Sequence, residues 1–247
     1  MLELDSWLEI AKSAALEGGQ YLLENQNKEQ KILLNKGRDI KLQLDADTEQ
    51  LIKHSLASKS EFSILGEETG LSNDVGEFYW VVDPLDGTSN FLRDIPISCV
   101  SIALMQNVTP ILGVIYDFNH DDLYFGHLDS SAFVNQIEIK VSDYADKSQS
   151  TLVTGIPAKT NYSDNEFKHM IDDFQQWKKV RMIGSAAMAS IYVAAGKADT
   201  YKENGIFLWD IAAGAAIVNA AGGVASITNV QADFRVDALF TNQNLAC

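Results

Sequence analysis

A buried strand that runs directly into an acidic turn constrains the fold more than any other stretch. Residues 78–82, Phe-Tyr-Trp-Val-Val, combine aromatic and β-branched side chains and predict a buried strand. Asp83 and Asp86 follow it, and Pro84 between them cannot pair in a ladder, so the chain is predicted to leave the sheet there. Gly87 permits a tight turn whose backbone N–H groups are free. Carboxylates beside such a turn suit a divalent cation together with a phosphate.

The composition favours a globular protein and excludes several classes of partner. The 247 residues, 46% of them apolar, can build one large domain or two small ones. Nineteen basic and 34 acidic residues give a net charge of −15, which opposes non-specific binding to nucleic acid or to an anionic membrane. Two cysteines indicate no disulfide framework. We read no signal peptide and no transmembrane run, and therefore expect a cytoplasmic protein that binds neither nucleic acid nor membrane.

The remaining patterns mix helices with short strands. Helical spacing predicts an amphipathic helix over residues 4–23, loosened at Gly18 and Gly19, and a second helix preceded by Asp45 and Asp47. Strands are predicted at residues 62–65, 99–104, 111–116, 123–126, 132–134, 152–154 and 180–183, and further helices at 166–177, 186–195 and from 209 to the glycines at 222 and 223. Periodicity alone supports a mixed α and β protein.

Three separate segments place carboxylates at strand ends or helix starts. They contribute Glu67 and Glu68, then Asp83 and Asp86, and finally Asp210. If these side chains converge, they cannot all stay ionised without a metal, and magnesium prefers such oxygen ligands. For Asp210 alone, an ordinary acid at a helix start explains the residue equally well.

These segments resemble, in order and approximate spacing, the signature segments of the inositol monophosphatase family. They are residues 66–68, 83–91 and 209–214, and the similarity extends to residues 184–187 and 221–223. The resemblance implies an α/β fold, α+β layered, in which helix and sheet layers alternate as an αβαβα sandwich. It also implies a lithium-sensitive, magnesium-dependent phosphoric monoester hydrolase that acts on a small phosphorylated substrate and forms a homodimer.

The resemblance implies the metal ligands residue by residue. Glu67, Asp83 and the backbone carbonyl of Leu85 would bind a first Mg²⁺. Asp83, Asp86 and Asp210 would bind the second. A third Mg²⁺ depends on the loop before residue 45, which looks shorter here than in the family. The expected cofactor is therefore two or three Mg²⁺ ions.

The resemblance also implies the residues that act on water and phosphate. Thr88, together with Glu67, would orient and deprotonate the attacking water. Asp45 matches the acid that hydrogen-bonds this threonine, and Asp47 is its rival for the role. The backbone N–H groups of Gly87 and Thr88 would donate to phosphate oxygens.

Substrate contacts are implied in the second part of the chain. Glu203 stands seven residues before Asp210, at the spacing of the family's acidic contact to substrate hydroxyls. Ser185 and Ala186 resemble the segment that flanks the sugar ring, and Asp210 would contribute to the substrate as well as to the metal. The alternative for Glu203 is a solvated acid on a loop.

The polar stretch at residues 142–150 is where we divide the chain. Residues 1–145 would form an N-terminal α+β half with most metal ligands. Residues 146–247 would form a C-terminal α/β half with Asp210 and the substrate contacts. The two halves are expected to make one compact catalytic unit.

The leading hypothesis is a phosphomonoesterase for inositol monophosphate or a related small sugar or polyol phosphate. Rivals within the superfamily are fructose-1,6-bisphosphate and a 3′(2′),5′-bisphosphate nucleotide, the latter disfavoured because residues 89–91 resemble the inositol-phosphatase version of the motif. Leu42 replaces the threonine of many members, and residues 128–135 lack a glycine-rich turn. A regulatory or binding protein that retains the site is the alternative of another class, and the intact ligand set argues against it.

Overall fold

Two sheets organise the chain in the computed structural model, which describes residues 3–37, 39–72, 74–157 and 161–246. The larger sheet has the strand order β10-β9-β8-β7-β6-β5-β3-β4. Its strands are β3 (Ser63–Gly66), β4 (Gly70–Leu71), β5 (Phe78–Asp86), β6 (Cys99–Gln106), β7 (Thr109–Asp117), β8 (Asp122–His127), β9 (Ala132–Val134) and β10 (Ile137–Ile139). The smaller sheet, in the order β12-β11-β13-β15-β14, contains β11 (Thr151–Thr154), β12 (Lys179–Met182), β13 (Thr200–Phe207), β14 (Val224–Thr228) and β15 (Arg235–Thr241). A separate hairpin pairs β1 (Ile32–Lys36) with β2 (Asp39–Leu42).

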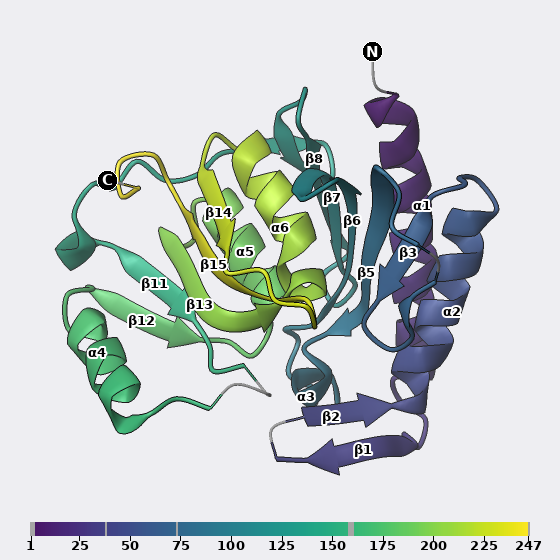
Figure 1. Ribbon diagram of the computed structural model, residues 1–247, viewed down its shortest axis with the longest axis horizontal. Helices are drawn as coiled ribbons and strands as arrows, with labels where there is room; N and C mark the ends of the chain where they lie inside the picture. The colour runs from purple at the N-terminus through teal and green to yellow at the C-terminus, as the bar shows by residue number, and fades with distance from the viewer. Residues whose placement is uncertain (1–2, 38, 73, 158–160, 247) are drawn as a thin grey trace.

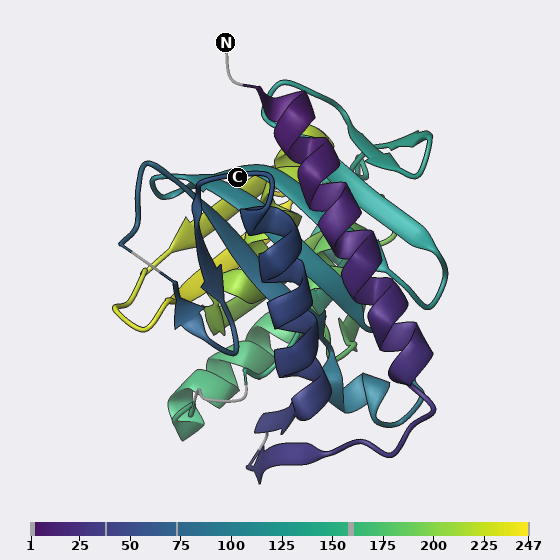
Figure 2. The same ribbon diagram turned by 90° about the vertical axis from the view of Figure 1, so that its right-hand side faces the viewer.

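Helices and sheets alternate in five layers (Figure 1). The outer face of the larger sheet is covered by α1 (Leu4–Asn25) and α2 (Gln43–Ala57), which lie side by side in Figure 2. The space between the sheets is filled by α5 (Ala186–Ala194) and α6 (Leu208–Ala220). Outside the smaller sheet lies α4 (Asp164–Phe174). The predicted αβαβα layering is confirmed.

The opening helix runs unbroken through Gly18 and Gly19, so the predicted loosening there is wrong. Both glycines are buried. A Cβ added to Gly18 would lie 2.8 Å from Cδ1 of Ile52, and one added to Gly19 would lie 2.4 Å from the ring of Tyr116. The two glycines therefore allow α1 to pack closely against α2 and the sheet.

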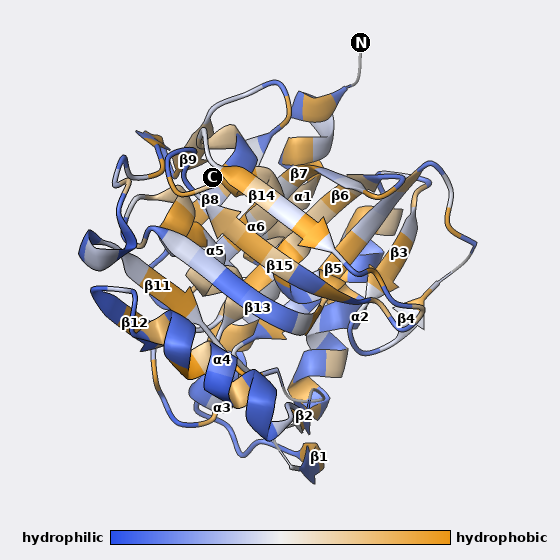
Figure 3. Cartoon of the chain, turned by 60° about the vertical axis from the view of Figure 1, so that its left-hand side comes forward, coloured by the Kyte–Doolittle hydropathy of each residue, from blue (hydrophilic) through white to orange (hydrophobic). Residues whose placement is uncertain are grey.

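α6 is apolar on every side because it lies between two sheets. A Cβ on Gly113 of β7 would lie 2.2 Å from the carbonyl oxygen of Ala213, and one on Gly214 would lie 2.3 Å from Cβ of Ser190 in α5. Figure 3 shows the largely apolar α6 behind the strands, with the more hydrophilic α4 in front. Close packing thus fixes the position of α6, whose first turn carries Asp210.

β5 does not end at Pro84, as the sequence predicts, but continues to Asp86. Its register on β6 shifts from the pair Asp83–Ser101 to the pair Asp86–Cys99, so one extra residue of β5 forms a bulge. Pro84 lies within this bulge, where its missing N–H costs no ladder hydrogen bond. The bulge brings both aspartates to the carboxyl end of an inner strand.

Two other predictions need correction or addition. α2 begins at Gln43, so Asp45 and Asp47 lie inside the helix rather than before it. The sequence prediction omits β13, β14 and β15, and charged and polar residues at 202–204 interrupt the apolar pattern of β13. None of the helices in the described ranges combines the length and the apolar composition that a membrane crossing requires.

Candidate metal centre

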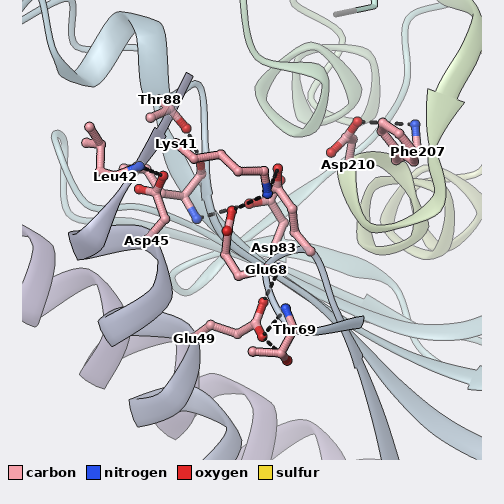
Figure 4. Close-up of polar contacts among 12 residues, drawn as sticks. Lys41, Leu42, Asp45, Glu49, Glu68, Thr69, Asp83, Thr88, Phe207 and Asp210 are labelled. Atoms are coloured by element: carbon pink, nitrogen blue, oxygen red, sulfur yellow. Dashed lines mark hydrogen bonds and ion pairs between the residues drawn. The ribbon is translucent and has the colours of Figure 1, made fainter. Parts of the chain in front are cut away.

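Three carboxylates from three different elements meet at one point. Glu67 follows β3, Asp83 lies on β5, and Asp210 lies in the first turn of α6. One carboxylate oxygen of each lies within 4.8 Å of those of the other two. Figure 4 shows Asp83 near the centre of the view and Asp210 to its right, beside Phe207. The fold therefore joins the three acidic segments that the sequence keeps far apart.

A cavity of about 180 Å³ lies over these carboxylates. Its walls come from the hairpin, from β5 and the turn after it, and from the starts of α5 and α6. The lining residues are Ile40, Glu67, Asp83, Leu85, Asp86, Gly87, Thr88, Ser89, Gly184 and Asp210. All five predicted metal ligands and both predicted phosphate-binding residues thus face one space.

The carboxylates of the turn are held by backbone and hydroxyl donors. The N–H of Leu85 donates to Oδ1 of Asp83 at 3.0 Å. Oδ2 of Asp86 accepts from the hydroxyl of Ser185 at 2.5 Å and from the N–H of Ala187 at 2.7 Å. The start of α5 therefore fixes Asp86 across the two parts of the chain.

The cluster is short of positive charge. Burial, followed by neighbouring negative charges, raises the pKa of Asp83 and of Asp210 well above the usual range. Burial likewise raises the pKa of Glu67 to about 7 and of Asp86 to about 6. Acids that resist ionisation together are stabilised by a bound cation, and a donor set made of oxygens fits a hard divalent ion. The residues present therefore fit Mg²⁺.

The one cation observed in this cluster is Lys41 of β2, among the residues that the structure describes. Its Nζ lies 2.7 Å from Oε1 of Glu68 and 3.7 Å from Oε1 of Glu67. Sequence reasoning missed this lysine, although the two-residue alternation of a strand through Leu42 would have put Lys41 on the face opposite that buried residue.

Comparison with known proteins identifies the family of this chain. The model of the inositol monophosphatase family matches residues 3–243. The chain is 38% identical over 229 residues to an inositol-1-monophosphatase of Synechocystis sp., covering 91% of this chain and 79% of that protein. This chain belongs to the inositol monophosphatase family.

Further comparisons agree with this family membership. A Nus factor SuhB of Xylella fastidiosa is 38% identical over 218 residues, covering 87% of this chain and 79% of that protein. The solved structure of an inositol monophosphatase from Anabaena (Nostoc) sp. PCC 7120 has 34% identity and a TM-score of 0.84, with 98% of this chain and 93% of that chain covered. The predicted enzyme class, a phosphoric monoester hydrolase, is confirmed by membership in this inositol monophosphatase family.

The direct hydrogen bond expected between Thr88 and Asp45 is absent among the described residues. The Thr88 hydroxyl donates instead to the carbonyl oxygen of Leu85 at 3.1 Å. Oδ2 of Asp45 accepts from the N–H of Leu42 at 2.8 Å, while its buried Oδ1 has no hydrogen-bond partner in the part of the chain that the structure describes. The rival Asp47 is exposed and accepts from Gln43 at 2.9 Å. In this member of the inositol monophosphatase family, Asp45 is thus the buried acid of the pair, and Figure 4 shows it near Thr88.

Of the substrate contacts predicted in the second part of the chain, Asp210 lines the metal cavity, whereas Glu203, Ser185 and Ala186 do not. Glu203 lies on β13 and is buried, so a solvated loop position is wrong. Its Oε2 accepts from the hydroxyl of Tyr201 at 3.0 Å, and burial raises its pKa to about 7. It faces a second cavity of about 210 Å³ between α4 and the smaller sheet. Ser185 binds Asp86, and the adjacent Ala186 is buried at the start of α5.

Proposed function

We propose that this chain is a magnesium-dependent phosphomonoesterase for inositol monophosphate or a related small sugar or polyol phosphate. The observation that carries this proposal is the convergence of Glu67, Asp83 and Asp210 on a cavity that Gly87 and Thr88 also line. Acidic oxygens and an N–H-rich turn are the two groups that a cation and a phosphate need. The names of the relatives support the polyol phosphate as substrate class.

The chain would hold the metal ions with its own oxygens. Glu67, Asp83 and the carbonyl of Leu85 would bind one Mg²⁺, and Asp83, Asp86 and Asp210 would bind a second. Bound Mg²⁺ supplies positive charge that lowers the pKa of water and balances charge on the transferring phosphoryl group. Lys41 already contributes a positive charge beside Glu67, and this charge disfavours a third ion there.

The turn after β5 would position the phosphate. Gly87 has a φ of 88°, and a Cβ there would lie 2.7 Å from the carbonyl oxygen of Ile97, so only glycine fits. The N–H groups of Gly87 and Thr88 would donate to phosphate oxygens. The hydroxyl of Thr88 and the carboxylate of Glu67 would orient the water and accept its proton. Oδ1 of Asp45, which has no hydrogen-bond partner among the described residues, would hydrogen-bond the threonine hydroxyl and hold it in that role.

Glu203, Ser185, Ala186 and Asp210 would define the side that receives the leaving alcohol. Glu203 would accept from a substrate hydroxyl, as the family resemblance implies. In this structure its carboxylate is already bonded to Tyr201, so we propose that substrate exchanges with or adds to that hydrogen bond. The same resemblance supports lithium inhibition, a homodimer and a cytoplasmic location.

A phosphate-release panel tests the proposal. Purified protein would receive inositol monophosphates, fructose-1,6-bisphosphate, phosphoadenosine phosphate and glycerol phosphate with Mg²⁺, and then with Mg²⁺ and Li⁺. We expect the highest kcat/KM for an inositol monophosphate and its loss with EDTA or Li⁺. Highest activity on fructose bisphosphate or on the nucleotide would identify that compound, rather than an inositol monophosphate, as the preferred substrate. No release from any compound, with Mg²⁺ bound, would favour a regulatory or binding protein.

A further inference from the structure

A fully buried glutamate supports the turn that carries Glu67. Glu49 lies on α2 and has an exposed fraction of 0%. Its Oε2 accepts from the N–H of Glu68 at 2.7 Å. Its Oε1 accepts from the N–H of Thr69 at 3.1 Å and from the hydroxyl of Thr69 at 2.5 Å. Figure 4 shows this carboxylate beside Thr69 and below Glu68, and Glu49 is not among the residues that line the metal cavity, so it is not itself a candidate ligand.

The turn is built around this carboxylate. A Cβ added to Gly66 would lie 2.4 Å from Cδ of Glu49, so residue 66 has to be glycine for the carboxylate to sit there. At the start of the turn, the N–H of Glu67 donates to the carbonyl oxygen of Val82 at 3.2 Å. Glu67 is thus fixed between a ladder hydrogen bond before it and the Glu49 bonds after it.

The nearby positive charge is too distant to be the main partner of Glu49. Nζ of Lys53 lies 3.9 Å from Oε1 of Glu49, and the same Nζ lies 2.6 Å from the hydroxyl of Thr69. The three N–H and O–H donors are closer to Glu49. A buried carboxylate is costly unless donors of this kind satisfy it, and hydrogen bonds to charged groups are the stronger class. Two of the three Glu49 bonds therefore hold the backbone of residues 68 and 69, and the third holds the Thr69 hydroxyl.

We propose that Glu49 is a positioning residue that sets the affinity of the Glu67 side of the site for Mg²⁺. This inference rests on the proposed metal-dependent function. Groups that orient a metal ligand without touching the metal commonly alter metal affinity by about 10–100-fold. Loss of the Glu49 bonds would free the turn and let the Glu67 carboxylate move away from Asp83 and Asp210.

Asp199 offers a matched control in the smaller sheet. It is also a buried acid, and it accepts from the N–H of Thr151 at 2.6 Å and from the hydroxyl of Ser142 at 2.5 Å. The Asp199→Asn variant therefore removes a similar charge-assisted network, but one that holds no metal-site residue. Its effect on Mg²⁺ binding shows how much a comparable loss of stability alone would contribute to the effect of Glu49→Gln.

The experiment measures Mg²⁺ binding directly by isothermal titration calorimetry, with thermal melting alongside. We expect Glu49→Gln to weaken Mg²⁺ binding by about 10–100-fold. Asp199→Asn should melt at a similarly lowered temperature but bind Mg²⁺ like the wild type. The kcat of Glu49→Gln should recover substantially at saturating Mg²⁺, because the ligands themselves remain.

The milder Thr69→Val variant removes the hydroxyl bond to Glu49, together with the bond that this hydroxyl accepts from Lys53, but keeps both backbone bonds to Glu49. We expect it to weaken Mg²⁺ binding a few-fold even if Glu49→Gln does not fold. Binding within twofold of the wild type by Glu49→Gln, or by Thr69→Val where only that variant folds, would overturn the role of Glu49. So would an equal loss of binding in Asp199→Asn. If the wild type itself binds no Mg²⁺, the proposed function fails first, and this inference fails with it.

Discussion

Glu67 and Asp210 reach the same point but are stabilised in different ways. Glu67 lies on a turn beside the ammonium group of Lys41, above the buried carboxylate of Glu49. Asp210 lies in the first turn of α6, where the helix dipole favours negative charge, and accepts from the N–H of Phe207 at 3.3 Å. Side-chain substitutions can therefore remove the support of Glu67. The support of Asp210 comes from backbone that substitutions leave in place.

The largest effect is expected when the carboxylate of one of these two acids is removed. Asp210→Asn should lower magnesium-dependent phosphate release by about 1,000-fold or more, because the site loses a charged ligand. The asparagine oxygen can still accept from Phe207, so the helix start should persist. Without metal, the variant should melt above the wild type, because one buried like charge is gone. Steady-state kinetics and melting in EDTA check both, with the exposed Asp129→Asn as control. Near-normal turnover would remove Asp210 from the proposed ligands.

The pH dependence of stability tests whether buried acids on both sides of the site lack compensating positive charge. Carboxyls in the unfolded chain have pKa values near 4, whereas burial raises the pKa of Asp45 to about 8 and of Glu203 to about 7 in the fold. Between these values the native state holds protons that the unfolded chain has released, so stability falls as pH rises. The melting temperature in EDTA should drop by about 5 °C or more from pH 5.5 to pH 8.5.

Glu67 and Asp86, whose pKa values burial also raises, add to this drop, and Mg²⁺ should reverse their part of it because the ion stabilises the ionised form of its ligands. Glu203→Gln should flatten the part of the slope below pH 7 while leaving the Mg²⁺ response intact. A melting temperature in EDTA that rises from pH 5.5 to pH 8.5 would contradict the raised pKa values.

A smaller effect should come from the cation on the Glu67 side. Lys41→Met removes a positive charge 3.7 Å from Glu67 and should tighten Mg²⁺ binding about fivefold, equivalent to about 1 kcal/mol. The titration belongs at pH 8.5, because the lysine also lowers the pKa of Glu67, and proton competition would otherwise mask the gain. Lys12→Met removes a helix-surface pair with Glu9 and serves as control. Weaker binding by Lys41→Met would instead assign the lysine a supporting role.

The sequence predicted which acids lie at the metal cavity better than it predicted the residues that support them. Asp83, Asp86 and Asp210 could be found because acids at strand ends and helix starts form local patterns. Glu49 and Lys41 could not, because their roles depend on which side chain α2 and the hairpin bring to the turn. The same reason explains the unbroken helix at Gly18, which is buried against Ile52. The division into residues 1–145 and 146–247 stays a proposal about folding units.

The smallest effect should come from the support that the start of α5 gives to Asp86. Burial raises the pKa of Asp86 to about 6, and the hydrogen bond from Ser185 limits that rise. Ser185→Ala should therefore weaken Mg²⁺ binding about two- to threefold at pH 6.5, while the N–H of Ala187 keeps Asp86 in place. At pH 8.5 the difference should nearly vanish, since Asp86 is then ionised in both proteins. A loss that is equal at the two pH values would mean that Ser185 acts on the geometry of Asp86 rather than on its charge. In that case α5 would hold its ligand as Glu49 is proposed to hold Glu67.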